Sequence, residues 1–238
     1  PPFFFRVFKT SASRASCYFR MPTLRQLLAT HAPLLLIDSA SSVIHVTVWR
    51  RAASGTEPVR ERREEEAGSG VFRATERALA RAGIGIGDVR AFAFGEGPGS
   101  VLGIRTAAAA IRTWRVVKPA PCFAFRGLEV VATALARPEL ALIVDARRDS
   151  WHVARAGQAL ARVPSTGLAA LAATPALPEG FRHWTPLPAG AERVPYDLPA
   201  ALDATADKPF FRETEEPEAF LYDVPAYALW TPKVHQAP

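Results

Sequence analysis

Residues 91–110 read AFAFGEGPGSVLGIRTAAAA, and the rest of the chain can be interpreted outward from them. An apolar, aromatic run ends at a turn rich in glycine and proline, and apolar residues then recur at helical spacing. This pattern predicts a strand over Val89–Phe94 that leads into a helix from Val101 to about Val117. Ser100 stands directly before the helix, where its hydroxyl can accept a hydrogen bond from a free backbone amide. The junction is therefore a strand, a chemically specified turn and a helix.

The turn itself is rich in residues that allow unusual backbone conformations. Glycine permits positive φ or the close approach of another segment, and proline removes a backbone donor. Backbone amides at a helix N-terminus can also bind phosphate. However, the motif lacks the Lys-Ser/Thr ending of a P-loop and the spacing of a dinucleotide fingerprint, so the sequence favours a turn required by packing. The predicted structural turn comprises Gly95, Gly97, Pro98, Gly99 and Ser100.

The composition indicates an ordinary globular protein. The chain has 238 residues, of which 49% are hydrophobic and 22% charged, which suffices for one large domain or two lobes of about 100 residues each. No apolar run approaches the roughly 20 residues that span a bilayer, so we expect no membrane role. The two cysteines suggest neither a disulfide framework nor a cysteine metal site, and they fit a reducing cytoplasm.

The N-terminal segment differs in composition from the rest. Four of the six net positive charges lie in residues 1–20, which contain no acid, so the basic character of the chain belongs mainly to a tail. Because Met21 follows directly, an over-extended reading frame is the first interpretation, and a transit peptide is the alternative. We expect residues 1–32 to form an extension outside the fold.

Two apolar strands end in aspartate and echo each other. Leu34–Asp38 and Leu140–Asp145 are each followed by a second strand-like stretch, and in both passages the aspartate precedes a histidine, His45 or His152, by seven residues. The echo suggests an internal duplication that yields two similar α/β lobes.

The predicted domain boundaries follow from this duplication. We place the N-terminal lobe at residues 33–121 and the C-terminal lobe at residues 122–238. Prolines and alanines are frequent from Val163 to Pro209, so the second lobe is expected to be shortened and irregular. The aromatic end of the chain, Pro217–Pro238, is interpreted as a segment that docks against the body.

Hydroxyl and carboxyl groups at the ends of the two apolar strands are candidate nucleotide-binding groups. Carboxylates and hydroxyls at the carboxyl end of a strand can hold hydrated magnesium and a nucleotide phosphate. The alternative is that they cap turns. The loop Asp145–Asp149, which carries two arginines, can bind phosphate, form inter-lobe ion pairs or be a solvated turn. The candidate nucleotide-binding residues are Asp38, Ser39, Ser41 and Asp145.

No catalytic set can be defended from the sequence. The five histidines are far apart and form no His-x-x-x-His pair, which argues against a metallopeptidase. There is no Gly-x-Ser-x-Gly motif, and Cys122 lies in an apolar context without a neighbouring histidine, so covalent hydrolysis has no support. We predict no catalytic residue and no metal site.

Three passages together resemble the TsaB proteins, also called YeaZ, which take part in making N6-threonylcarbamoyladenosine on tRNA. They are residues 36–41 (LIDSAS), residues 95–105 (GEGPGSVLGIR) and residues 144–148 (VDARR), in the same order and at similar separation. The resemblance implies the fold of the actin, sugar-kinase and Hsp70 superfamily, with two ribonuclease-H-like lobes. It also implies a degenerate member that has lost most nucleotide contacts and supports a catalytic relative, TsaD.

The resemblance further implies a partner surface on the two helices that flank the turn. In the family these helices pack against TsaD or a second copy of TsaB, and here they correspond to Phe72–Ala82 and Val101–Ile111. Small alanines would permit close approach and larger residues would supply apolar area. The expected interface residues are Phe72, Leu79, Val101, Ile104, Ala107, Ala108 and Ile111.

This chain departs from the family pattern at three places. Val101-Leu102-Gly103 stands where the family usually has Phe-Thr-Gly, and Glu96 stands where it has arginine. Residues 66–69 also lack the His-Ser pair that opens the earlier helix. These departures concern the partner surface more than the fold.

The resulting expectation is a cytoplasmic, non-catalytic partner subunit that supports a TsaD homologue in modifying adenosine 37 of tRNA. A TsaE-type ATPase would join the complex, the chain could also form a homodimer, and tRNA would be contacted indirectly. We expect no tightly bound cofactor, with ATP or ADP and magnesium only at the complex interface. The alternative is a small-molecule kinase of the same superfamily with its own ATP site.

Overall fold

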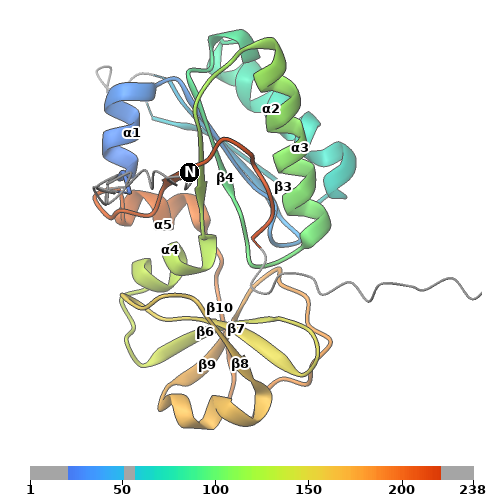
Figure 1. Ribbon diagram of the computed structural model, residues 1–238, viewed down its shortest axis with the longest axis vertical. Helices are drawn as coiled ribbons and strands as arrows, with labels where there is room; N and C mark the ends of the chain where they lie inside the picture. Colours follow the sequence, from blue (N-terminus) through green and yellow to red (C-terminus); the bar gives the residue numbers. More distant parts are fainter. Residues whose placement is uncertain (1–20, 51–56, 221–238) are drawn as a thin grey trace, which may run out of the picture.

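Two β-sheets, one in each lobe, organise the described residues of the computed structural model, 21–50 and 57–220 (Figure 1). The strand order is β11-β5-β4-β1-β2-β3 in the first sheet and β10-β9-β6-β7-β8 in the second. The first sheet contains β1 (Leu34–Asp38), β2 (Ile44–Trp49), β3 (Val59–Arg63), β4 (Ala91–Gly95), β5 (Cys122–Phe125) and β11 (Arg212–Glu213). The second contains β6 (Leu140–Asp145), β7 (Ser150–Ala154), β8 (Ala161–Pro164), β9 (Thr174–Pro178) and β10 (Glu192–Val194).

The two sheets repeat one topology. In each, the first strand pairs antiparallel with the second and parallel with the fourth, and the fifth strand extends the parallel side. The duplication suggested by the two Asp-ending strands is therefore present in the fold. The registers differ by one residue, since Asp38 lies opposite His45 whereas Asp145 lies opposite Trp151.

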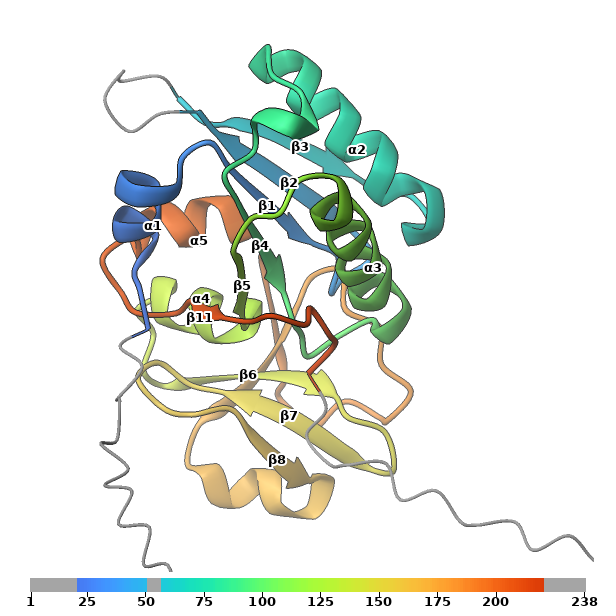
Figure 2. The ribbon, with the colours of Figure 1, turned by 45° about the horizontal axis from the view of Figure 1, so that its top comes forward.

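Helices cover both faces of the first sheet. Helices α2 and α3 lie on one face, and α1 and α5 lie on the other (Figures 1 and 2). Because both faces are covered, every residue of β1, β2, β4 and β5 is buried, which explains their continuous apolar sequences. The helices are α1 (Leu24–His31), α2 (Ala67–Ala82), α3 (Val101–Val117), α4 (Gly127–Ala134) and α5 (Leu198–Ala204), with short 3₁₀ turns η2 (Ile86–Asp88) and η3 (Ser165–Leu171).

The chain crosses between the lobes at two helices. Helix α4 follows β5 of the first sheet and packs on β6 and β7 of the second (Figure 2). Helix α5 follows β10 of the second sheet and packs back on β2 of the first. The two helices also contact each other, so the crossings form one junction between the lobes.

The prediction that residues 1–32 lie outside the fold is wrong for α1. Thr23 caps this helix, since its hydroxyl accepts from the backbone N–H of Gln26 at 3.2 Å and the Gln26 side chain accepts from the Thr23 N–H at 2.9 Å. Leu24 and Leu27 are buried in the core of the first lobe. Residues 1–20 lie outside the described part of the chain, as do residues 221–238 of the predicted docking segment.

The predicted lobe boundary between residues 121 and 122 is also wrong. Strand β5 pairs with β4, so Cys122–Phe125 completes the first sheet. Strand β11, near the end of the described chain, then pairs with β5. Parallel pairing between strands distant in sequence leaves no local signal, which is why the boundary was misplaced. Within Val163–Pro209 the chain forms short strands and α5 between loops.

No helix among the described residues combines the length and the apolar character needed to cross a membrane.

Candidate functional site

The glycine-rich turn packs against the loop that follows β1. A Cβ on Gly99 would lie 2.2 Å from the carbonyl oxygen of Ala40, and one on Gly103 would lie 2.1 Å from that of Ser39. The backbone N–H of Ser100 donates to the Ala40 oxygen at 2.7 Å. The Ser100 hydroxyl caps α3 by accepting from the Gly103 N–H at 3.3 Å, as predicted. The glycines thus serve close backbone packing, and the amide of Ser100, at the end of the turn, is already bonded within the chain.

Asp38 lies directly behind this turn and is buried by it. The side chain is fully buried, and a Cβ on Gly95 would lie 2.0 Å from its Oδ1. Its Oδ2 accepts a hydrogen bond from the Tyr196 hydroxyl at 3.1 Å, while Oδ1 has no hydrogen-bond partner among the described residues. Burial raises the pKa of Asp38 to about 6, against the hydrogen bond from Tyr196. Asp38 therefore faces the junction between the lobes instead of an open ligand site.

His45 and Tyr196 complete this buried polar cluster. Burial is the main cause that lowers the pKa of His45 to about 4, and the positive charge of Arg62 adds to it. The His45 and Tyr196 rings meet edge to face, with centroids 6.2 Å apart. The Tyr196 hydroxyl also lies where a Cβ on Gly127, the first residue of α4, would come within 2.2 Å. Tyr196 thus joins β1, α4 and the segment before α5, a contact that no local sequence pattern indicates.

A cleft of about 500 Å³ opens between the two lobes. The two lobes are joined beside the cleft by a hydrogen bond in which the backbone N–H of Ser42 donates to the Gly180 oxygen at 2.8 Å. Of the candidate nucleotide-binding residues, Ser41 and Asp145 line the cleft and Asp38 and Ser39 do not. The lining otherwise includes Ser42, Glu65, Glu66, Ser100, Val101, Leu102, Arg147, His152, Arg182 and Trp184.

The Asp145 carboxylate organises one end of this cleft. Its Oδ1 accepts from the backbone N–H of Arg147 at 2.7 Å, and its Oδ2 accepts from those of Trp184 and Thr185 at 2.7 Å each. Burial is the largest single influence and raises the pKa of Asp145, but the three backbone hydrogen bonds together hold the pKa below its usual value. The Asp145 carboxylate is therefore ionised, and both of its oxygens already accept hydrogen bonds from backbone amides of the chain.

The cleft does not fit a magnesium–nucleotide site of an active kinase. Asp38 lies behind the turn, Asp145 is engaged by backbone amides, and the Ser100 amide of the turn is bonded to Ala40. Glu65 and Glu66 add carboxylates to the lining, which disfavour a phosphate. Within residues 21–50 and 57–220, no cluster of three His, Cys, Asp or Glu side chains is placed to hold a metal ion.

Five of the seven residues predicted to contact a partner are buried in the chain, although one of them, Leu79, also lines a surface groove. The small alanines of α3 allow it to lie close to α2 and the first sheet, so the flat face of the helix is used within the lobe. Phe72 and Val101, which are 40% and 49% exposed, remain accessible. Periodicity shows which face of a helix is apolar, but it cannot show what covers that face. The buried five are Leu79, Ile104, Ala107, Ala108 and Ile111.

The outer side of the same two helices carries an apolar surface. A groove of about 370 Å³ lies between α2, η2 and the end of α3, and Phe72, Leu79, Ile84, Ile86 and Trp114 supply its apolar lining. Trp114 forms its floor, meeting Phe72 edge to face at 6.0 Å and stacking on buried Phe92 at 6.1 Å. Val116 and Val117 are also exposed at the end of α3. We call this groove, with Val116 and Val117, the α2–α3 surface.

Glu96, the acid in the glycine turn, is neutralised by two arginines. Its carboxylate is buried and pairs with Arg126 at 3.3 Å and Arg212 at 2.7 Å. Its carbonyl accepts from the backbone N–H of Phe220 at 2.8 Å, and the Arg126 guanidinium stacks on the Phe220 ring at 4.3 Å. Glu96 therefore holds α4, β11 and the segment that follows β11, residues 214–220, at the end of β4. We call residues 214–220 the strap; the sequence did not predict this role of Glu96.

Comparisons with known proteins agree with this architecture. Residues 69–174 match the model of the family described as TsaD, tRNA N6-adenosine threonylcarbamoyltransferase. The fold is similar to YeaZ from Pseudomonas aeruginosa, with a TM-score of 0.55 and 21% sequence identity over 74% of this chain and 91% of that one. A second solved structure, titled as an uncharacterized protein with similarity to peptidase YEAZ from Pseudomonas aeruginosa, has a TM-score of 0.55 and 20% identity over 82% and 99% of the two chains. No curated protein matches the chain.

These findings confirm the predicted fold class and, at the level of fold, the resemblance to the TsaB/YeaZ proteins. The structural neighbours span both lobes, whereas the TsaD family model spans α2, the glycine turn, α3 and the central strands of the second sheet. The chain is thus a TsaB/YeaZ-like protein in fold, with the sequence pattern of the TsaD family over residues 69–174.

Proposed function

We propose that this chain is a non-catalytic partner subunit that supports a TsaD homologue in forming N6-threonylcarbamoyladenosine on tRNA. The observation that carries the proposal is the use of the glycine turn, the most specific shared motif, for packing between two loops of the first lobe. The glycines of this turn make room for the backbone of the loop after β1, which is a structural role. A phosphate-binding loop would instead leave its backbone amides free for the ligand. The match to the TsaD family model and the YeaZ-like fold support the same pathway step.

The α2–α3 surface is the proposed docking site for the TsaD homologue. It comprises an apolar groove with an aromatic floor, together with Val116 and Val117, which are exposed in the last turn of α3. Exposed apolar surface on a protein often marks an interface. A second copy of the chain would compete for the same surface, so a homodimer is an alternative assembly of the free subunit.

The proposed complex has further components that the chain itself does not need to hold. A TsaE-type ATPase would join the TsaD homologue, and ATP or ADP with magnesium would bind only where subunits meet. A free-standing small-molecule kinase has less support, because Asp38 is buried behind the turn and the Ser100 amide is already bonded to the Ala40 oxygen. The cleft of about 500 Å³ is the one feature that favours it.

Affinity purification from the native host tests the proposal. We expect the TsaD homologue to co-purify with the unaltered chain and to be lost with Phe72→Asp, which places a charge in the groove. Arg193→Ala, a change at an exposed residue of β10, is the matched control and should retain the partner. Deletion of the gene should lower the modified adenosine in cellular tRNA. Wild-type abundance of that nucleoside, or ATP turnover by the purified chain, would overturn the proposal.

A further inference from the structure

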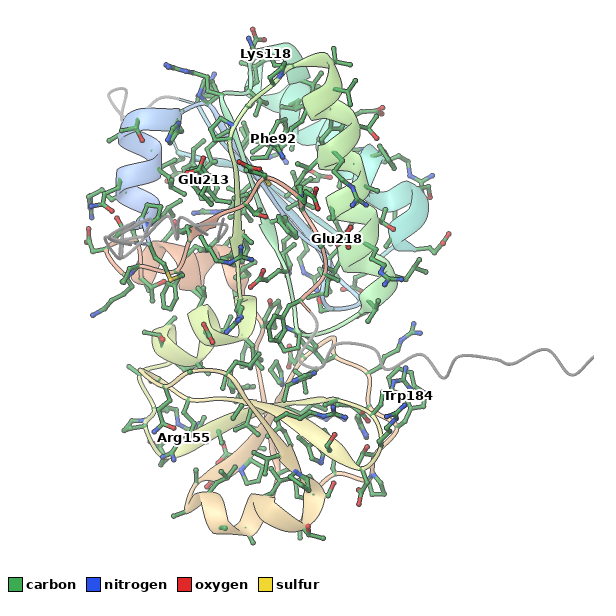
Figure 3. All side chains as sticks on the ribbon, viewed as in Figure 1. Phe92, Lys118, Arg155, Trp184, Glu213 and Glu218 are labelled. Carbon is green, nitrogen blue, oxygen red and sulfur yellow. The ribbon has the colours of Figure 1, made fainter. Side chains whose placement is uncertain are left out.

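An exposed tryptophan stacked with an arginine stands at the edge of the inter-lobe cleft. Trp184 is 62% exposed and lies at the border of the second lobe, on the side of the molecule where α3 lies (Figure 3). The guanidinium carbon of Arg147 lies 3.1 Å from the centre of the indole ring. Large aromatic side chains are rarely left this open, so the pair calls for an explanation beyond packing.

The pair is held in place by a single carboxylate. Both oxygens of Asp145 are engaged by backbone N–H groups, one at Arg147 and the other at Trp184 and Thr185. The hairpin between β6 and β7 and the loop after β9 are therefore fixed relative to each other on either side of the stack. A platform organised from two separate loops in this way is preorganised for a ligand.

The hairpin that carries the arginine has an unfavourable backbone conformation. Arg147, Arg148 and Asp149 all have left-handed φ angles, between 52° and 64°, although none is glycine. The conformation is secured by the Ser150 hydroxyl, which donates to the Arg147 oxygen at 2.6 Å, and by Arg162, which donates to the Ala146 oxygen at 3.2 Å. Local strain retained by surrounding hydrogen bonds is typical of binding sites.

Three exposed arginines, Arg147, Arg148 and Arg182, lie on the second-lobe side of the stack. Of the acids near them, Asp145 is engaged by backbone donors and Asp149 is exposed on the same hairpin, while Glu65 and Glu66 line the cleft from the first lobe. Across the cleft, the start of α3 presents Leu102, which is 66% exposed. A planar aromatic ring, a planar cation and further arginines form a combination that suits a flat ligand attached to phosphates.

We propose that the Arg147–Trp184 pair is a stacking site for an unpaired base of single-stranded RNA, with Arg148 and Arg182 contacting the adjacent phosphates. Unstacked bases pack on aromatic side chains and on arginine planes, and this contact tolerates different bases because every base has a π face. The inference rests on the proposed function for the choice of RNA, an anticodon stem-loop, and it goes beyond that function by assigning this chain a direct RNA contact.

The test measures binding of a fluorescein-labelled anticodon stem-loop RNA to the full chain alone by fluorescence anisotropy. We expect Trp184→Ala to weaken binding about tenfold, as the loss of one base–aromatic stack does, and Trp184→Phe to retain most of the affinity. Arg147→Ala should also weaken binding. Arg148→Ala and Arg182→Ala should each reduce the slope of log affinity against log salt by about one. Arg193→Ala removes a charge elsewhere on the lobe and should have a smaller effect.

Three results would overturn the inference. These are no binding of the stem-loop at low salt, unchanged binding by both Trp184→Ala and Arg147→Ala, and equal dependence on Trp184 when the probe is an RNA duplex or a free nucleotide. Circular dichroism checks that each variant is folded, and Trp184→Phe and Arg147→Ala keep the test valid if Trp184→Ala is not. Co-purification of the TsaD homologue with Trp184→Ala separates this inference from the proposed function, since the docking surface lies on α2 and α3.

Discussion

Asp38 and His45 are two buried titratable residues whose effects on stability oppose each other. Asp38 has a pKa of about 6 in the folded chain, above its ordinary value, so the stability it contributes is present at low pH and is lost as pH rises through 6. His45 has a pKa of about 4, below its ordinary value, so its contribution is present above pH 6.5 and is lost as pH falls through 4. Each shift corresponds to roughly 3 kcal/mol.

Single substitutions should separate the two effects. In Asp38→Asn, His45 is the member of the pair that still titrates, so the pair's contribution to the free energy of unfolding should fall by about 3 kcal/mol between pH 6.5 and pH 4. In His45→Gln, Asp38 is the member of the pair that still titrates, so the pair's contribution to the free energy of unfolding should rise by a similar amount as pH falls from 7 to 4. Urea unfolding at a series of pH values measures both profiles.

The double variant is the control for this prediction. Asp38→Asn with His45→Gln should give a profile close to that of the unaltered chain, because the two contributions cancel in the latter. Parallel profiles for the two single variants would contradict the assignment of the cluster.

At the residue scale, the sequence predicted residues that act on their immediate neighbours, but it did not predict residues that act through partners far away in the chain. Ser100 was correctly predicted as the cap of α3 because a cap is defined by its immediate neighbours. Glu96, Trp184 and Tyr196 take their roles from partners far away in the sequence, at separations of up to 158 residues for Tyr196 and Asp38. No spacing rule links such pairs, so their roles became visible only in the structure.

At the element scale, Glu96 is the contact that holds the last described segment on the first lobe. Its side chain is almost fully buried and its two arginine partners come from the start of α4 and from β11. The strap that follows β11 then runs beside α3, where Arg115 donates to the Glu215 oxygen at 2.6 Å and Arg112 pairs with Glu218. Removal of one carboxylate should therefore loosen a whole segment.

Glu96→Gln should lower the free energy of unfolding by about 2 kcal/mol, because hydrogen bonds from two charged groups to a buried acceptor are weakened. It should also expose the segment after β11 to limited proteolysis under native conditions. The matched control is Asp207→Asn, which removes the partner of Arg25 in a pair that is fully exposed to solvent and should alter neither measurement. Equal effects of the two variants would show that Glu96 is not the fastening contact.

The elements themselves were predicted where their signals are local. Strand β4, the turn and α3 were anticipated with nearly their observed bounds, because alternation, capping and breaking residues all occur within one stretch. Helix α1 lies within the predicted extension of residues 1–32, although Thr23 and Gln26 form a capping box that indicates a helix start. Strand β11 has two residues and exists only because β5 offers an edge, so its own sequence carries no signal.

At the scale of the whole molecule, the two lobes differ in how they are assembled from the chain. The strands of the second sheet, β6 to β10, are contiguous in sequence between Leu140 and Val194. The first sheet takes β5 and β11 from beyond the predicted boundary, and α5 returns from the far side of the second lobe to cover it. The first lobe is therefore completed only after almost all of the described chain is present.

Two fragments make this difference testable. Residues 21–121 contain β1 to β4 but lack β5, so β4, which is buried throughout, would become an exposed edge. We expect this fragment alone to give a poorly dispersed amide NMR spectrum and no cooperative urea transition. Residues 127–197 keep α4 and all five strands of the second sheet, and they should unfold cooperatively, though at lower urea than the full chain because so small a domain buries less surface.

Complementation provides the decisive comparison between the two halves. When residues 122–238 are added to residues 21–121, β5 and β11 become available to β4 and the first sheet can form. The mixture should therefore regain a dispersed spectrum and a cooperative transition, whereas adding residues 127–197, which lack both strands, should not restore either. A well-dispersed spectrum from residues 21–121 alone would mean that the first lobe is independent of the returning segments, and the junction at α4 and α5 would then be a tether between two domains instead of part of one folding unit.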